Sequence, residues 1–274
     1  MKLVLDIKVI AYLLIAFMVS HLSANENRTN REPRINYGYK ANIWDFPYQV
    51  SLHYDGEYIC SGVIIGEHYA LTAAHCVFAV ESDFFTIRSG SSFRSSGGKA
   101  HRIHLDDIHI PYDYNFLTFD CDIALIYAKE PFISNDSVAK AVLLPNSSYA
   151  PPPLTMGLVT GWGTCTTCPI DIPEQFQAVE VPLMDYEICK RLYSKLTERM
   201  ICASYEHGQK GTLRGDSGGP LVVNGVLVGL VSRSEFPFPM AENPDIYTSV
   251  IALSDWIVGK IAELEAKTHT PHKI

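Results

Sequence analysis

Residues 215–220 read Gly-Asp-Ser-Gly-Gly-Pro, and this stretch decides the fold and chemistry expected of the 274-residue chain. Its glycines predict a tight turn in which a reacting carbonyl can approach the backbone beside the Ser217 hydroxyl. A serine hydroxyl is a weak nucleophile at neutral pH. It therefore needs a base that takes its proton and a carboxylate that holds the base in the right tautomer.

Two upstream segments offer those groups: Thr-Ala-Ala-His-Cys at 72–76 and Asp-Ile-Ala-Leu at 122–125. An acid directly before an apolar run lies at the edge of a buried strand, where an ion needs a partner, and His75 supplies one. We expect Ser217 to be the nucleophile, His75 the general base and Asp122 the orienting carboxylate. The alternatives are an ordinary hairpin, a structural histidine and a strand-start aspartate. A zinc site at His75 is disfavoured because no second His/Cys pair has ligand spacing.

The order His, Asp, Ser with these local contexts resembles the chymotrypsin/trypsin-like serine peptidase family from about residue 35 to 257. The resemblance implies an all-β fold of two six-stranded antiparallel β-barrels, at about 35–150 and 154–250, with the site between them. It also implies that the backbone N–H groups of Gly215 and Ser217 form the oxyanion hole. Ser232 resembles the family serine that hydrogen-bonds the aspartate and helps to line the substrate pocket.

The pattern along the chain agrees with an all-β fold. After residue 35, short apolar runs are divided by turn residues, as expected for strands. Helical spacing is confined to residues 251–266, which we expect to form a C-terminal α-helix, and the polar tail 267–274 is expected to be disordered. The expected strands are Tyr48–Tyr54, Gly62–Ile65, Ile123–Tyr127, Gly157–Thr160, Gly219–Val223 and Val226–Val231.

The first residues predict export and processing. Two lysines, an apolar stretch and then small residues have the layout of a secretory signal peptide over residues 1–24. Residues 25–34 are a polar segment before the Arg34-Ile35 junction, and the resemblance implies that they are an activation propeptide. By the resemblance, a cut after Arg34 frees the amino group of Ile35, which pairs with Asp216 and organises the oxyanion loop. The peptidase domain is then 35–266, in a secreted, extracellular protein.

Composition narrows the partners. The net charge is −8 without a basic cluster, so nucleic acid is not an expected partner, and no apolar run after residue 24 is long enough for a membrane span. We expect no cofactor and no metal. By the resemblance, the loop that sometimes binds calcium would fall at residues 91–100, which lack the acids that a calcium site needs. Expected partners are protein or peptide substrates and an activating trypsin-like peptidase. Protein inhibitors of peptidases are a further class of partner, and the protein is expected to be a monomer.

The seven cysteines divide unevenly. The resemblance implies two disulfide bonds, Cys60–Cys76 and Cys189–Cys202. The other three are Cys121, Cys165 and Cys168, for which a local bridge or a link involving Cys121 is expected, with one thiol left over. The sequence does not say which thiol that is.

Substrate specificity is where the chain departs most from the family. Gly211 occupies the pocket floor, where trypsin-like enzymes carry Asp, and Asp245 stands where a glycine usually lines the wall. This arrangement resembles the arthropod-like pocket of crustacean collagenolytic peptidases. Asp245 either favours Lys and Arg side chains or pairs internally and leaves an apolar pocket. Three further positions are expected at the rim: Arg214, Arg233 and Ser234.

Two functions follow from these features. The first is a secreted serine endopeptidase that acts through a Ser-His-Asp triad and an acyl-enzyme, and that is activated from a zymogen. The second is a weakly active or inactive paralogue that serves as a binding or decoy protein. Arg233, Ser234 and the altered mature start, Ile-Asn-Tyr-Gly at 35–38, favour the second. The complete Ser-His-Asp set favours the first.

Overall fold

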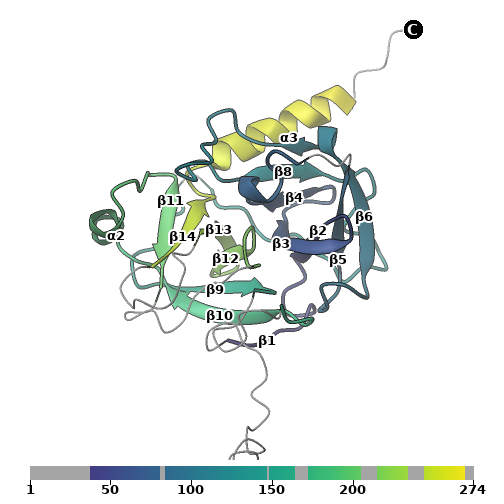
Figure 1. Cartoon of the computed structure of the whole chain (residues 1–274), viewed down its shortest axis with the longest axis horizontal. Helices are drawn as coiled ribbons and strands as arrows, with labels where there is room; N and C mark the ends of the chain where they lie inside the picture. Colours follow the sequence, from purple (N-terminus) through teal and green to yellow (C-terminus); the bar gives the residue numbers. More distant parts are fainter. Residues whose placement is uncertain are drawn as a thin grey trace, which may run out of the picture. The chain divides into compact units, whose positions relative to one another are not determined.

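The structure is a computed structural model that describes residues 38–80, 84–146, 148–163, 172–204, 215–233 and 244–268. All of them belong to one compact unit, Arg34–Ile274. Two antiparallel sheets lie side by side in this unit (Figure 1), and the described residues give each sheet seven strands. The all-β fold with a C-terminal helix is confirmed. Each sheet has one strand more than expected, because a two-residue strand extends one edge.

The first sheet has the strand order β6-β5-β2-β3-β4-β8-β7. In β5 every second residue is buried, as the pleat of a strand with one inward face requires. Phe85 and Ile87 from β5 pack with Ile103 from β6 in the core of this sheet. The strands are β2 Gln49–Tyr54, β3 Glu57–Ile64, β4 Tyr69–Thr72, β5 Phe84–Ser89, β6 Lys99–His104, β7 Ile108–His109 and β8 Ala124–Tyr127.

The second sheet has the order β1-β10-β9-β12-β13-β14-β11. Val159, Leu221, Val228 and Tyr247 are almost fully buried in its core. The strands are β1 Tyr39–Lys40, β9 Met156–Gly161, β10 Gln177–Pro182, β11 Met200–Ala203, β12 Pro220–Val223, β13 Val226–Arg233 and β14 Asp245–Ser249. The runs expected at 157–160, 219–223 and 226–231 therefore lie in one sheet.

The start of the described chain belongs to the second sheet, although residues from 35 on were expected in the first barrel. β1 pairs with β10, with Tyr39 opposite Ala178. Beyond the strand, the Ala41 N–H donates to Phe176 O at 2.9 Å. Ile43 and Phe46 then pack on Phe176 in a separate apolar cluster, which explains why this segment lies there.

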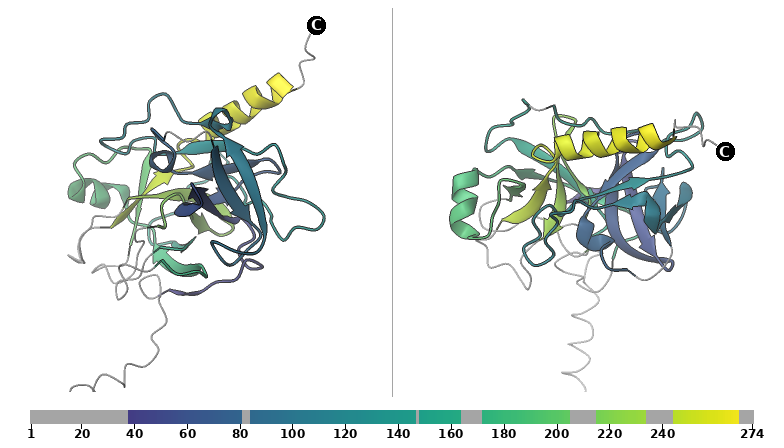
Figure 2. Two further views of the ribbon diagram at one scale, coloured as in Figure 1. Left: turned by 45° about the vertical axis from the view of Figure 1, so that its right-hand side comes forward. Right: turned by 90° about the horizontal axis from the view of Figure 1, so that it is seen from above.

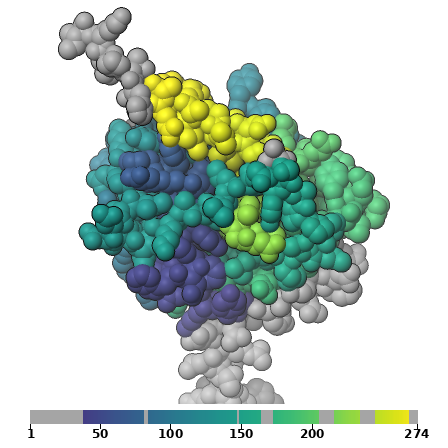
Figure 3. Space-filling model, turned by 180° about the vertical axis from the view of Figure 1, so that it is seen from behind, coloured from purple at the N-terminus to yellow at the C-terminus, as the bar shows by residue number. Residues whose placement is uncertain are grey.

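Helix α3 spans Ser254–Thr268, so it begins and ends slightly later than expected and includes residues assigned to the tail. Leu253 and Ile257 pack with Val63 and Leu71 of the first sheet and with Leu230 of the second. The helix runs from the end of β14 across to the first sheet (Figure 2) and lies on the surface (Figure 3). It therefore covers the apolar residues where the two sheets meet.

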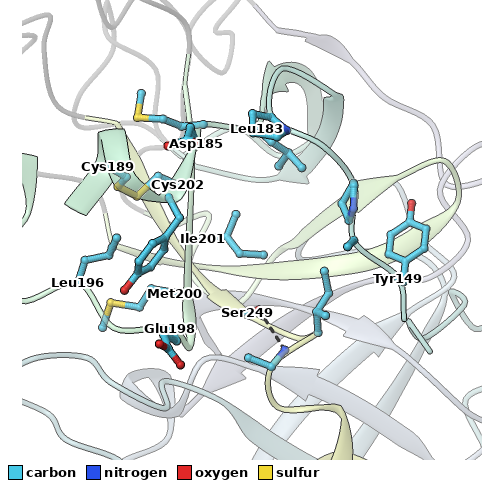
Figure 4. Close-up of a pocket in the computed structure, with 17 residues that line it drawn as sticks. Tyr149, Leu183, Asp185, Cys189, Leu196, Glu198, Met200, Ile201, Cys202 and Ser249 are labelled. Carbon is cyan, nitrogen blue, oxygen red and sulfur yellow. Dashed lines mark hydrogen bonds between the residues drawn. A yellow bond between two sulfur atoms is a disulfide. The ribbon is translucent and has the colours of Figure 1, made fainter. Parts of the chain in front are cut away.

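A second helix, α2 (Tyr186–Leu192), was not expected. Asp185 caps it, since its carboxylate accepts the Ile188 N–H at 3.1 Å. Beside α2 and β11 lies a mainly apolar cavity of about 430 Å³, with Glu198 and Met200 in its wall (Figure 4). The described residues also form two short 3-10 helices: η1 Ala74–Cys76 and η2 Leu105–Asp107. Among the described residues, no helix has the length and apolar character of a membrane span.

Candidate active site

His75 lies in the middle of η1, directly after the end of β4. Ala73 and Ala74 are fully buried, so only small side chains fit on the inner side of this turn. The Cys60–Cys76 disulfide ties the turn to β3. The His75 side chain is 24% exposed, so it can meet both a buried acid and a group in solvent.

The Asp122 carboxylate is completely buried just before β8, and three donors serve it. Its Oδ1 accepts the His75 backbone N–H at 2.9 Å. Its Oδ2 accepts from His75 Nδ1 at 2.8 Å and from the Ser232 hydroxyl at 2.6 Å. A carboxylate buried in an apolar interior needs such donors, because a buried polar group without hydrogen bonds is costly.

This contact also sets the tautomer of the imidazole. A carboxylate can only accept a hydrogen bond, so Nδ1 of His75 carries the proton in the 2.8 Å contact. In the neutral ring, Nε2 is then left with a lone pair. His75 is therefore prepared to accept a proton at Nε2.

Ser217 lies in a turn between two glycines with positive φ, Gly215 at 103° and Gly218 at 76°. A side chain at either position would strain the backbone, which is why the turn needs glycine there. Ser217 is half-buried. Two backbone bonds fix the turn, from Gly218 N to Val231 O and from Gly219 N to Asp216 O, both 2.8 Å.

The Ser217 turn belongs to the second sheet but rests directly on the first. The Ser61 N–H in β3 donates to Ser217 O at 2.8 Å. A Cβ added to Gly218 would lie 2.5 Å from Ser61 O, and it would also collide with the Thr72 hydroxyl. Thr72 is three residues before His75. The turn that carries Ser217 is thus pressed against the segment that carries the candidate base.

The two residues before Ser217 are held by buried polar contacts. The Gly215 carbonyl accepts the Tyr58 hydroxyl at 2.5 Å, and burial raises the pKa of Tyr58, so the phenol stays a donor. Asp216 is fully buried, and its Oδ1 accepts the Gly163 N–H at 2.7 Å. A Cβ at Gly161 or Gly163 would overlap the Asp216 carboxylate, so these glycines make room for it.

Of the expected pocket residues, the structure describes Ser232, Arg233 and Asp245. Asp245 is 8% exposed at the start of β14. The Arg233 guanidinium lies 5.9 Å from the ring centroids of both Phe119 and Tyr193. Arg34, Ile35, Gly211, Arg214 and Ser234 lie outside the described residues, as does the pair Cys165 and Cys168.

The Cys60–Cys76 and Cys189–Cys202 disulfides are both present in the structure. Ligand atoms of Cys60, His75 and Cys76 lie within 4.8 Å of one another, but sulfurs joined in a disulfide are not the thiolates that zinc prefers. Cys121 is a buried free thiol, and burial raises its pKa to about 12.

Sequence reasoning missed several residues around the site. The Phe119 ring meets the His75 ring edge-on, with centroids 5.4 Å apart, and Tyr58 supports Gly215. Tyr193 faces Arg233. Phe119 was within reach of a prediction, because it is an aromatic residue three positions before Asp122. Tyr58 gives no local signal, since its contact with Gly215 joins distant parts of the chain.

An aspartate–histidine pair on one antiparallel sheet and a glycine-bounded serine turn on the other are the arrangement of the class of serine hydrolases with a two-sheet fold. The comparisons narrow this class. The model of the Trypsin family matches residues 35–257, and the chain belongs to this family of trypsin-like serine peptidases.

Relatives and solved structures agree. The chain is 37% identical to trypsin Blo t 3 of Blomia tropicalis over 81% of this chain and 84% of that protein. It is 34% identical to the vitellin-degrading protease of Bombyx mori over 93% and 96%. The structure of mouse neuropsin, a serine protease, has a TM-score of 0.73 at 30% identity and covers 82% of this chain and 99% of that one. The scabies mite inactivated protease paralogue S-D1 has a TM-score of 0.74 at 27% identity, over 82% and 96%.

Proposed function

We propose that this chain is a secreted serine endopeptidase that hydrolyses peptide bonds of protein or peptide substrates. One arrangement carries the proposal. The buried Asp122 carboxylate accepts a hydrogen bond from His75 Nδ1 at 2.8 Å, and the Ser217 turn packs against the segment that carries His75. Membership of the Trypsin family supports it further.

In the proposed reaction, His75 Nε2 takes the hydroxyl proton of Ser217 as Oγ attacks the substrate carbonyl carbon. The backbone N–H groups of Gly215 and Ser217 stabilise the oxyanion, each donor being worth about 2.7–4 kcal/mol. The imidazolium then gives its proton to the departing amine, which leaves an acyl-enzyme. Water then attacks the acyl carbon as His75 Nε2 takes its proton. The imidazolium returns that proton to Ser217 Oγ as the carboxylic acid leaves, and Asp122 stabilises the imidazolium in both steps.

Zymogen activation is the second part of the proposal. A cut after Arg34 frees the Ile35 ammonium, which pairs with Asp216 and organises the neighbouring oxyanion loop. Support comes from the Asp216 carboxylate, which is fully buried beside Ser217 where an opposite charge is strongly favoured. The disulfide bonds and the sequence of residues 1–24 support secretion.

The test is active-site labelling. Protein cut after Arg34 should react stoichiometrically with an organophosphonate at Ser217, and Ser217→Ala should abolish the labelling with the fold retained. Arg34→Gln, which removes the cleavage site, should leave the chain unlabelled after treatment with a trypsin-like peptidase. A peptide library then distinguishes basic from apolar substrates for the pocket that includes Asp245.

A weakly active or inactive paralogue remains the second candidate. Two observations favour it: the Arg233 guanidinium lies 5.9 Å from the ring centroids of Phe119 and Tyr193, and a solved structure of similar fold is an inactivated protease paralogue of the scabies mite. Failure of correctly cut, folded protein to label at Ser217 would support this function over the first.

A further inference from the structure

The segment that leads into Asp122 adopts an unfavourable backbone conformation. Phe119 and Cys121 have φ values of 60° and 56°, in the left-handed region that residues with a Cβ rarely occupy. Both make contacts that matter, since Phe119 packs on His75 and Cys121 is buried. Such a conformation persists only where surrounding contacts hold it.

Local bonds supply part of those contacts, such as the Phe119 N–H to Asn115 O at 2.7 Å, and the other sheet supplies the rest. Arg199, directly before β11, donates from Nε to Asp120 Oδ1 at 3.1 Å and from its Nη2 to Asp120 Oδ2. Its Nη1 donates to Asp113 Oδ2 at 2.8 Å. The Thr197 hydroxyl adds a bond to Asp120 Oδ1 at 2.7 Å. A planar guanidinium that grips one carboxylate at two points fixes direction as well as distance.

The pKa of Asp120 agrees with a strong interaction between its carboxylate and Arg199. Burial by itself raises the pKa of this carboxyl, but hydrogen bonds from Arg199 and Thr197 outweigh it, so the pKa is lowered overall. The side chain of Asp120 is 14% exposed and that of Arg199 is 38% exposed, so solvent reaches the pair mainly from the arginine side. Asp120 therefore stays ionised and bound to Arg199 at neutral pH.

Arg199 is itself firmly placed. Its carbonyl accepts the Ser249 N–H at 2.8 Å, and the next residue, Met200, pairs with Thr248 in the sheet. The Thr248 hydroxyl donates to the backbone carbonyl of Asp122 at 2.8 Å. The second sheet thus holds the segment at two points, Asp120 and Asp122, on either side of Cys121.

We infer that Arg199 is a positioning residue for the peptidase reaction: by binding Asp120 it holds the 119–121 turn that sets Asp122 and Phe119 against His75. The inference rests on the proposed function, since it concerns the reaction of the same site. It assigns a role in catalysis to a residue that contacts none of the three candidate catalytic side chains directly.

The experiment compares Arg199→Met with Arg199→Lys and Asp120→Asn, all in protein cut after Arg34. Arg199→Met should lower kcat about 10- to 100-fold with KM changed less than about threefold, because misplacement by an ångström has effects of that size. Arg199→Lys keeps the charge but loses the planar fork, so it should recover part of kcat. Arg199→Met with Asp120→Asn should be no worse than Arg199→Met alone.

Lys99→Met is the control, since it removes a cation from the exposed ion pair between Lys99 of β6 and Glu130, at 3.0 Å. It should leave kcat within about twofold of the unchanged protein. A second readout is the low-field proton resonance of the His75 Nδ1–H···Asp122 bond. We expect it to shift or broaden in Arg199→Met and to stay in place in Lys99→Met.

The outcomes separate the two proposals. If Arg199→Met lowers thermal stability as Lys99→Met does but changes neither kcat nor the resonance, the positioning role is refuted. If unchanged protein fails to label at Ser217, the proposed function fails, and the resonance still tests whether Arg199 positions the pair. Should Arg199→Met not fold, Arg199→Lys and Asp120→Asn give the same comparison with smaller changes.

Discussion

Asp122 and Ser217 belong to one candidate site, but different forces fix them. Donated hydrogen bonds hold Asp122, two at its carboxylate from His75 and one from Ser232. Backbone hydrogen bonds hold the Ser217 turn, and its close packing needs a residue without a side chain, because Gly218 fits against Thr72 and Ser61 only without a Cβ. We therefore expect the region around Asp122 to be sensitive to substitutions that remove hydrogen-bond donors, and the Ser217 turn to be sensitive to substitutions that add volume.

The largest effect is expected from Gly218→Ala. Left-handed strain of roughly 1–2 kcal/mol and crowding of about 1–3 kcal/mol add to a loss of about 2–5 kcal/mol in the free energy of unfolding. Gly225→Ala is the control, since Gly225 has φ of 80° with nothing within 4 Å of an added Cβ, and should lose only the strain. Urea unfolding measures both. Equal losses would show that the turn is not crowded.

The two disulfides sharpen the comparison. They close loops of similar size, with sequence separations of 16 and 13, so replacing either pair by alanines should cost about 3 kcal/mol. Only Cys76 adjoins His75. The Cys60/Cys76 double variant should therefore lose more kcat than the Cys189/Cys202 variant at a similar loss of stability. The reverse order of kcat would contradict the role given to η1.

Ser232→Ala tests the polar half alone. A hydrogen bond to a charged group contributes about 1.5–3 kcal/mol, so stability and kcat should both fall. Thr248→Val is the matched control, since the Thr248 hydroxyl serves the neutral carbonyl of the same Asp122 and should cost about 0.5–1.5 kcal/mol. Calorimetry and peptide hydrolysis measure the two effects. A larger loss for Thr248→Val would overturn this ranking.

Acid should act on the sheet that carries His75 and Asp122. Burial, with Lys99 nearby, lowers the pKa of His101 in β6 to about 4. Between about pH 6.5 and 4 the unfolded chain binds the proton and the folded one does not. The stabilisation is therefore complete above pH 6.5 and is lost as the pH falls, by at most about 1.4 kcal/mol per unit. His101→Gln should flatten the decline of Tm between pH 7 and 4, and an unchanged slope would exclude His101 as its source.

The sequence predicted the features that depend on local pattern. Apolar runs located β9, β12 and β13 nearly to the residue, and the motif at 215–220 pointed to the glycines that the turn needs. Helix α2 could have been predicted from the Asp185 cap, but its seven residues carry too short a periodic pattern. For β1, only pairing with β10 reveals its place.

Local sequence patterns could not predict the contacts between the two sheets. The bond from Ser232 to Asp122 was implied by the family resemblance, but Arg199 with Asp120 was not, since the two are 79 positions apart. Nothing in the residues around Arg199 distinguishes it from an ordinary surface arginine. Its partners depend on how the two sheets pack, which no local pattern encodes.

The backbone bond from Ser61 to the Ser217 carbonyl forms only when the two sheets pack together, so the proposed site is completed by the same step that completes the fold. In a nascent chain whose two sheets have not yet packed together, this bond is absent, and Ser217, the proposed nucleophile, is not yet in place. For a protein proposed to pass through a secretory compartment, incompletely folded copies would then be harmless to their neighbours. Incomplete folding would therefore prevent proteolysis by itself, in addition to any inhibition by the propeptide.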